Sequence, residues 1–279
     1  MRAIVILISI LLGSAFHVHA QGLIVTYEET TTIQMQRPDL GQSNDPRIRD
    51  NPQIRAAIES QLRGMNKDME LNRSATSQLI VNNGMSMYKP QTSEQPDIRT
   101  GEEEGRVGNV NMRGNITTQI TTANTQTFKN HLDKIIVTQF SFDGKEYLIE
   151  EPLTEYKWNI RRNRREISGF QCVQATTRTR DGTNVVAWYT PDIPVSDGPS
   201  SYRGLPGLIL YLEINQNNGS RVFSCTSIEH VDEMPNIELP DKGEKISRTE
   251  FDKMMRERVE TMQRRNAESG RSGGTVIIR

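Results

Sequence analysis

The chain has 279 residues, with 34 Lys and Arg against 35 Asp and Glu, so its formal net charge at pH 7 is −1. A nearly neutral chain gives no electrostatic reason to expect nucleic acid or an anionic membrane as a partner. It has two cysteines and four histidines, and no His-Glu-x-x-His arrangement occurs. We therefore expect neither a metal centre nor a cofactor. A single domain of this length can bury an ordinary core.

Residues 1–20 have the pattern of a secretory signal peptide. Arg2 supplies a positive charge, Ile4–Leu12 form an apolar run, and Val18-His19-Ala20 fits a cleavage site of small residues. The apolar run is too short to span a membrane, and the absence of a cysteine near the cleavage point argues against a lipoprotein anchor. We expect a protein exported to the periplasm or cell envelope, with a mature chain that begins at Gln21 and has no membrane span.

The first elements of the mature chain are a strand and a helix. Residues 22–35 are rich in Ile, Val, Thr and Tyr and predict a strand, and residues 37–52 read as a polar linker. Asn51 followed by Pro52 is typical of a helix start. Apolar residues then recur at steps of three and four, at Ile54, Ile58, Leu62, Met65 and Met69. Methionine at this spacing is more typical of core than of a soft-metal site.

Hairpins and one polar segment follow. Residues 76–88 predict a hairpin that turns at Asn82-Asn83-Gly84, and residues 135–149 predict another at Asp143-Gly144. Residues 90–113 contain prolines, glycines and the acidic run Glu102–Glu104, so we interpret them as a mobile insertion.

A basic cluster, Arg161-Arg162-Asn163-Arg164-Arg165, lies between two short apolar segments. Such clusters can mark contact with nucleic acid or heparin. For an exported, nearly neutral chain, the favoured interpretation is a solvated turn between two strands.

The second half of the chain predicts an antiparallel meander that ends in a helix. Short strands between residues 170 and 229 are joined by glycine turns. Ser247 and Glu250 form the capping-box pattern of a final helix, and residues 266–279 read as a flexible tail with a short terminal strand. Gly270-Arg271-Ser272-Gly273-Gly274 formally matches a nucleophile elbow, but that elbow needs a preceding strand rather than a helix. A hydrolase role is therefore disfavoured.

The chain is organised around residues 191–207, a proline-rich loop that is long for the interior of a domain. Pro206-Gly207 predicts a type II turn, because glycine accepts a positive φ at the second central position. The turn has apolar flanks at Leu205, Leu208 and Ile209 and is expected to be buried. We favour a structural clasp over the core, with a binding loop as the alternative.

The candidate contacts for a ligand or partner lie in and beside this loop: Trp188, Asp192, Asp197, Tyr202 and Arg203. Asp192 and Asp197 are also typical turn formers. No two carboxylates share an element in a recognisable acid/base arrangement, so no catalytic residue is predicted. Cys172 and Cys225 could form one disulfide in an oxidising compartment or remain two buried thiols, and both alternatives stay open.

The hexapeptide Gly204-Leu205-Pro206-Gly207-Leu208-Ile209 resembles the signature of the GLPGLI family, which comprises exported proteins of Bacteroidota. Further segments fit the same pattern: Ala187-Trp188-Tyr189, Ile193-Pro194, Gly198-Pro199, the pair Gly169 and Cys172, Gly22–Glu28 and Met85–Tyr88. The resemblance covers most of residues 21–36, 70–89 and 125–230. The family has no assigned function, so the resemblance implies a class and a compartment rather than a mechanism.

We expect an α+β fold, in which residues 21–265 form one domain. One curved, half-barrel-like antiparallel sheet would have one helix before its main strands and one after them. The predicted function is that of a non-enzymatic envelope protein that binds or carries a ligand inside the curved sheet. The alternative is an interaction or accessory module of an outer-membrane complex, whose partner would be an outer-membrane or periplasmic protein. An enzyme is disfavoured.

Overall fold

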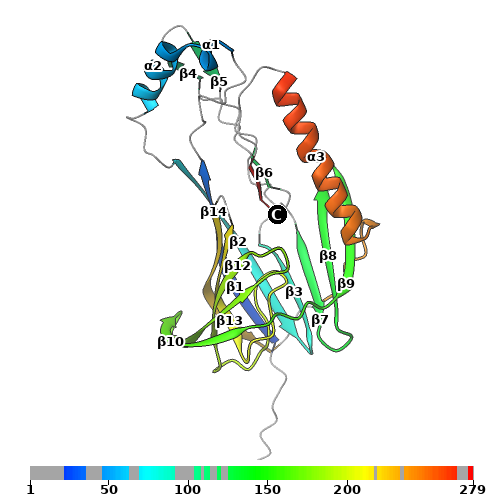
Figure 1. The fold of residues 1–279 in the computed structure, drawn as a ribbon. Coiled ribbons are helices and arrows are strands. Elements are labelled where there is room, and N and C mark those ends of the chain that lie inside the picture. Colours follow the sequence, from blue (N-terminus) through cyan, green and yellow to red (C-terminus); the bar gives the residue numbers. More distant parts are fainter. Residues whose placement is uncertain are drawn as a thin grey trace, which may run out of the picture.

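The computed structural model is built around a single open, curved sheet of twelve strands (Figure 1). It describes residues 22–35, 46–62, 69–91, 104–107, 110–113, 118–120, 125–216, 219–232, 236–268 and 276–278. The order of the strands across the sheet is β10-β11-β12-β13-β14-β1-β2-β3-β7-β8-β9-β15. All strand pairs of this twelve-stranded sheet are antiparallel except the short pair between β15 and β9. The expected α+β fold with a curved antiparallel sheet is confirmed.

The helices and strands of the described residues follow in this order along the chain. The first half contains β1 (Gly22–Met35), α1 (Pro46–Arg49), α2 (Pro52–Leu62), β2 (Met69–Asn82), β3 (Met85–Pro90), β4 (Glu104–Val107), β5 (Val110–Arg113), β6 (Thr118–Ile120), β7 (Gln126–Asn130) and β8 (Ile135–Phe142). The second half contains β9 (Lys145–Pro152), β10 (Asn159–Ile167), β11 (Phe170–Arg178), β12 (Asn184–Thr190), β13 (Leu208–Gln216), β14 (Gly219–Val231), β15 (Glu244–Lys245), α3 (Arg248–Glu268) and β16 (Val276–Ile278). The pairs β4–β5 and β6–β16 lie outside the main sheet.

The start of α2 follows the prediction, and its end does not. The Asn51 side chain accepts hydrogen bonds from the backbone N–H groups of Gln53 and Ile54, at 3.1 and 3.3 Å, which is the expected N-cap. The expected helical stripe runs on to Met69, but α2 ends at Leu62. Met69 instead opens β2 and pairs with Met35 of β1, because sheet pairing with a distant strand overrides the local helical period.

The Arg-rich cluster is not a turn, so that prediction is wrong. It lies inside β10, which forms one edge of the sheet and pairs with β11 alone. The actual turn is Ser168-Gly169, where both residues have positive φ. Pairing with β11 holds the arginines in a strand, although their exposure is as expected.

The face of the sheet that carries Val25, Tyr27, Leu212 and Phe223 is here called the inner face, and each of these four side chains is fully buried. Alternate residues of a strand point to opposite faces. On β2 and β9, however, neighbouring residues are both buried, because the segment around Ile237 packs on the far side. Toward the β9 edge, α3 packs on the sheet and Phe251 meets Phe140 edge-on at 4.9 Å (Figure 1).

The last helix begins with the predicted capping box. The Glu250 side chain accepts a hydrogen bond from the Ser247 backbone N–H at 2.7 Å, and the Ser247 hydroxyl accepts one from the Glu250 N–H at 3.2 Å. Within the described part of the chain, no helix is both long and apolar enough to cross a membrane. The predicted signal peptide and most of the 90–113 insertion lie outside the described residues.

Candidate functional site

The loop of residues 191–207 leaves the end of β12 and returns to the start of β13. It folds through local bonds, such as Val195 N–H to Ile193 O and Asp197 N–H to Val195 O, both at 2.8 Å. It also adds to the sheet, since the Ile209 N–H donates to Asp197 O at 3.0 Å. Ile193, Asp197, Tyr202 and Leu205 are all buried. The loop therefore lies on the core as a clasp.

The turn that closes this loop differs from the prediction. The Gly207 N–H donates to Leu205 O at 2.8 Å, so the turn spans three residues rather than the four of a type II turn. Gly207 has φ of 152°, and a Cβ there would lie 2.0 Å from Thr190 O. Glycine is required because the two ends of the loop touch each other through their backbones.

Asp197 belongs to a buried charged group that we call the anchor cluster, formed by Lys129, His131 and Asp197. The Lys129 ammonium donates to the Asp197 carboxylate and to Gly198 O, the latter at 2.8 Å. His131 Nε2 lies 2.9 Å from the other carboxylate oxygen. The side chains of Lys129 and Asp197 are 0% and 1% exposed, and that of His131 is 20% exposed. Asp197 therefore fixes the loop to β7 and has no free carboxylate oxygen.

Within the anchor cluster, the buried charge of Asp197 is stabilised by its neighbours. Burial by itself would raise the pKa of Asp197, but the Lys129 charge and the His131 hydrogen bond hold that pKa at about 2. The Gly198 N–H adds a third hydrogen bond, of 2.7 Å. Burial lowers the pKa of Lys129, and the charge of Asp197 opposes that shift. A carboxylate with this many donors is typical of a structural ion pair rather than of a proton donor.

Tyr202 and Arg203 are held by the segment that connects β9 with β10. The Tyr202 ring stacks on Tyr156 with centroids 4.9 Å apart, and Trp158 Nε1–H donates to Arg203 O at 2.8 Å. Burial raises the pKa of Tyr202 well above its usual range. Asp192 lies on the same loop and is exposed. Its backbone N–H donates a hydrogen bond to the Thr190 hydroxyl at 3.3 Å.

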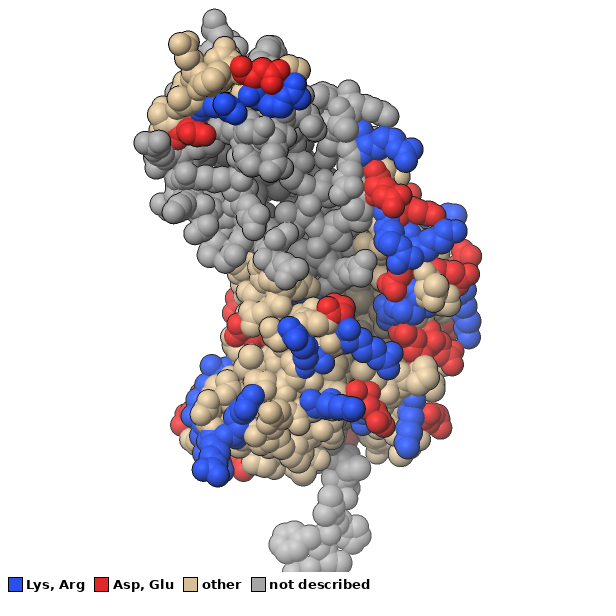
Figure 2. All heavy atoms as spheres, in the orientation of Figure 1, with Lys and Arg blue, Asp and Glu red and all other residues tan. Residues whose placement is uncertain are grey.

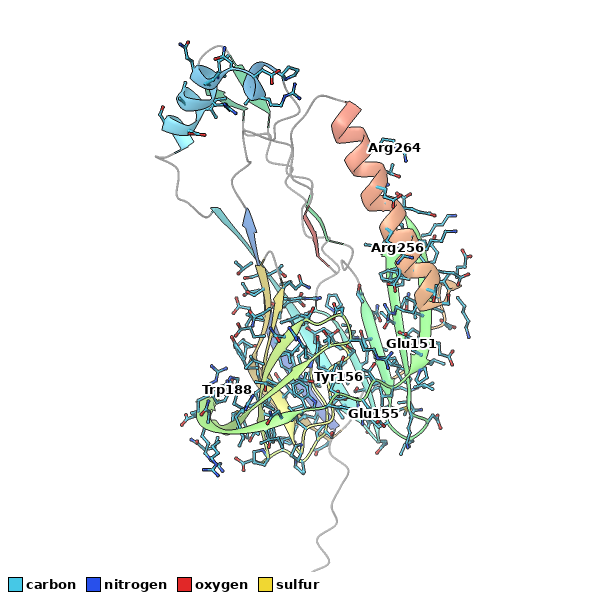
Figure 3. All side chains as sticks on the ribbon, in the orientation of Figure 1. Glu151, Glu155, Tyr156, Trp188, Arg256 and Arg264 are labelled. Carbon is cyan, nitrogen blue, oxygen red and sulfur yellow. The ribbon has the colours of Figure 1, made fainter. Side chains whose placement is uncertain are left out.

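Trp188 faces the opposite way, on the outer face of the sheet, where its ring meets the Arg165 guanidinium at 4.3 Å. In Figure 3 it lies beside β10 at the left margin, whereas Tyr156 lies nearer the middle of the fold. The five candidate residues are thus not brought together into one site.

A second polar group, absent from the sequence-based prediction, lies on the inner face. We call Glu29, Tyr88 and Arg221 the inner-face cluster. Arg221 Nη2 lies 2.6 Å from Glu29 Oε1, and the two side chains are 16% and 14% exposed. The Arg221 guanidinium also lies over the Phe223 ring at 4.9 Å. An ion pair partly open to solvent and set against aromatic core residues is an arrangement suited to binding.

The Tyr88 hydroxyl in this cluster is buried and has no hydrogen-bond partner among the described residues. Ser77 and Glu29 lie close to it, but neither meets hydrogen-bond geometry. Tyr27, its neighbour on the inner face, does find one, because its hydroxyl donates to Ile209 O at 2.6 Å. Burial raises the pKa of Tyr88 far above its usual value, with the Glu29 charge adding to the shift. The hydroxyl is therefore protonated and available as a donor.

Cys172 and Cys225 are both free and buried, so the disulfide considered above is not formed in this structure. Their sulfurs lie 3.6 Å from the carbonyl oxygens of Phe170 and Ser227, respectively. Burial raises the pKa of each thiol to about 11, so neither is an activated nucleophile. Across the described ranges, no three His, Cys, Asp or Glu side chains are grouped as metal ligands would be.

Comparison with known proteins places part of the chain near a family of unknown function. Residues 176–211, which run from the end of β11 to the start of β13, match the model of a family described as a protein of unknown function, Porph_ging. No curated protein sequence matches the chain.

Solved structures also match the chain, at low sequence identity. Two structures of PNGF-II, in space groups P21 and C2, are 13% and 14% identical with TM-scores of 0.49 and 0.47. They cover 84% of this chain, which spans 33% and 32% of theirs. An uncharacterised conserved protein from Thermus thermophilus is 6% identical, with a TM-score of 0.33. The match covers 80% of this chain and 90% of the Thermus chain. The chain thus spans about a third of the PNGF-II chains.

Proposed function

We propose that this chain is an exported, non-enzymatic cell-envelope protein that binds or carries a small polar ligand on the inner face of its curved sheet. The observation that carries the proposal is the buried, unpartnered hydroxyl of Tyr88 beside the Arg221–Glu29 ion pair. A buried polar group without a partner costs about 1–3 kcal/mol, and nearly all such groups in folded proteins are satisfied. A bound ligand would supply the missing partner.

The chemistry of the inner-face cluster restricts the ligand. Glu29 and Arg221 balance each other, so a ligand with a net charge would leave one buried charge uncompensated. The Tyr88 hydroxyl can donate and accept a hydrogen bond. The buried rings of Tyr27 and Phe223 lie behind the cluster, with centroids 6.3 and 6.1 Å from that of Tyr88, and make its surroundings apolar. These features favour an uncharged ligand that has hydroxyl or amide groups on an apolar framework.

The binding role is favoured over catalysis because the titratable groups are engaged with one another. The carboxylate of Asp197 is occupied by Lys129, His131 and a backbone N–H. Within the inner-face cluster, burial by itself would lower the pKa of Arg221, but the Glu29 charge raises it, and burial keeps Tyr88 protonated. The pKa of Asp197 is held far below neutrality, and those of Arg221 and Tyr88 are raised far above it, so none of these three groups suits general acid–base catalysis at neutral pH.

The pattern of residues 1–20 supports export to the envelope. The hexapeptide Gly204–Ile209 resembles the signature of the GLPGLI family and supports membership of that family. The match of residues 176–211 to a family of unknown function includes this hexapeptide. Fractionation of cells that make the protein, followed by sequencing of its N-terminus, tests export. A mature chain in the envelope that begins at Gln21 is expected, and an intact N-terminus in the cytoplasm would contradict it.

Native mass spectrometry of the full chain, isolated gently from the envelope of cells that produce it, tests the binding role. The expected result is a complex heavier than the mature chain that loses a small molecule on denaturation. The alternative of an accessory module predicts instead a stable protein partner after crosslinking in intact cells. A chain that carries neither a small molecule nor a partner would overturn the binding proposal.

A further inference from the structure

A second surface, along the β10 edge of the sheet, is independent of the inner-face cluster. Residues 157–180 contain seven basic residues and a single acidic one, Glu166, in a chain with a net charge of −1. Figure 2 shows Lys and Arg gathered at the lower left, where Figure 1 places β10. Arg161, Arg162 and Arg164 are exposed, and within the described residues none of them forms an ion pair. This concentration of unneutralised charge attracts a polyanion.

The strand is distorted where it carries the arginines. Ile160 pairs with Ala175 and Arg164 with Val173, so three residues of β10 lie opposite the single residue Gln174 of β11. The Asn163 side chain donates to that of Gln174 at 2.8 Å. Such bulges re-aim side chains. A bulged, charged edge also resists the addition of another strand, which argues against a protein partner that binds by extending the sheet.

Arg165 is fixed more firmly than its neighbours. Its guanidinium lies 4.3 Å from the ring centroids of both Trp188 and Tyr211, which are paired directly across β12 and β13. Contact with two rings holds the planar head in one orientation, so less side-chain entropy is lost when it binds a carboxylate. The Tyr211 hydroxyl in turn donates to Glu213 at 3.2 Å.

We propose that this edge surface binds a linear acidic polysaccharide. Exposed guanidinium groups along an edge strand suit carboxylates spaced along a polymer, and each can be bound by two parallel hydrogen bonds. The amides of Asn163 and Gln174 and the carboxylate of Glu213 suit sugar hydroxyls. Glu166 and Glu213 would repel the dense phosphates of a nucleic acid or an anionic bilayer, whereas a sugar polymer carries its charges farther apart and brings neutral hydroxyls between them.

Binding of the full chain to polygalacturonate, measured by isothermal titration calorimetry or biolayer interferometry, tests this proposal. The probes for comparison are neutral dextran, polyglutamate, oligothymidylate and anionic lipid vesicles. We expect binding to polygalacturonate that weakens as salt is added, no binding to dextran, and at least tenfold weaker binding to the other three anions. Equal or tighter binding to polyglutamate, oligothymidylate or vesicles would overturn the proposal, as would no binding to polygalacturonate.

Two variants of equal charge give the control. The triple substitution Arg161→Gln, Arg162→Gln and Arg164→Gln should weaken binding at least tenfold. The triple substitution Lys253→Gln, Arg256→Gln and Arg264→Gln removes the same charge from α3, far from Trp188 in Figure 3, and should change it less than twofold. Arg165→Lys keeps the charge but loses the planar head, and should weaken binding severalfold. Equal losses in both triple variants would show a general charge effect and overturn the proposal.

Discussion

The ammonium of Lys129 donates a hydrogen bond to the carboxylate of Asp197, and both side chains are withdrawn from solvent. This contact joins residues 68 positions apart and fastens the central loop to the sheet. The candidate site residue Asp197 is thereby assigned to the clasp, and binding chemistry is left to side chains elsewhere on the sheet.

Removal of the Asp197 carboxylate charge should lower the free energy of unfolding. In Asp197→Asn the ammonium of Lys129 loses its counter-ion inside the protein, and breaking a buried pair in this way costs about 3–5 kcal/mol. Urea denaturation of the variant measures the loss. The matched control is Asp192→Asn, on the exposed side of the same loop, which should change the free energy of unfolding by less than about 0.5 kcal/mol. Equal stability of the two variants would contradict the anchoring role.

Acid should weaken the protein through the same carboxylate. The pKa of Asp197 is about 2 in the folded chain against about 3.9 when unfolded. The group therefore stabilises the fold fully above about pH 5 and loses that contribution as pH falls toward 2. The full loss amounts to about 2–3 kcal/mol, because one pKa unit corresponds to about 1.4 kcal/mol. Titration of the Asp197 carboxyl carbon by NMR should give a midpoint near pH 2, and a midpoint above pH 4 would refute the ion pair.

Gly207→Val should prevent folding. Its Cβ would lie 2.0 Å from Thr190 O, in a φ region that side chains rarely adopt. Gly182→Val is the control, because Gly182 also has a positive φ but its Cβ would meet nothing within 4 Å. That variant carries only the backbone strain of about 1–2 kcal/mol and should remain soluble. Circular dichroism and solubility distinguish the two, and a normally folded Gly207→Val protein would refute the close contact at this turn.

Local signals in the sequence predicted the parts of the fold that depend on neighbouring residues. The N-cap at Asn51 and the capping box at Ser247 both follow from a few adjacent positions. The hairpin turn at Asp143-Gly144 is another example, with positive φ at both residues. A glycine at position 207 was also expected from a local turn, but it is required because a Cβ there would meet Thr190 at the other end of the loop.

Contacts between distant strands left no comparable local signal. Nothing near Lys129 in the sequence indicates that its partner is Asp197, and Glu29 meets Arg221 only because β1 and β14 pair. The arginines of β10 were mistaken for a turn because a charged edge strand has no apolar alternation to mark it. A charged residue at an inward position of a strand, as at Lys129 and Glu29, is the one sequence signal that could have indicated both clusters.

Replacement of a single hydroxyl tests the central claim most directly. Tyr88→Phe removes the unpartnered group from the inner face and keeps the ring contacts with Tyr27 and Phe223. The chain should remain as stable as the wild type or become more stable, because no hydrogen bond is lost. The control Tyr211→Phe removes a hydroxyl from the outer face.

Both variants would be isolated from the envelope and compared with the wild type by native mass spectrometry. We expect Tyr88→Phe to carry at least tenfold less of the bound small molecule and Tyr211→Phe to carry the wild-type amount. Equal occupancy in Tyr88→Phe and the wild type would contradict this expectation.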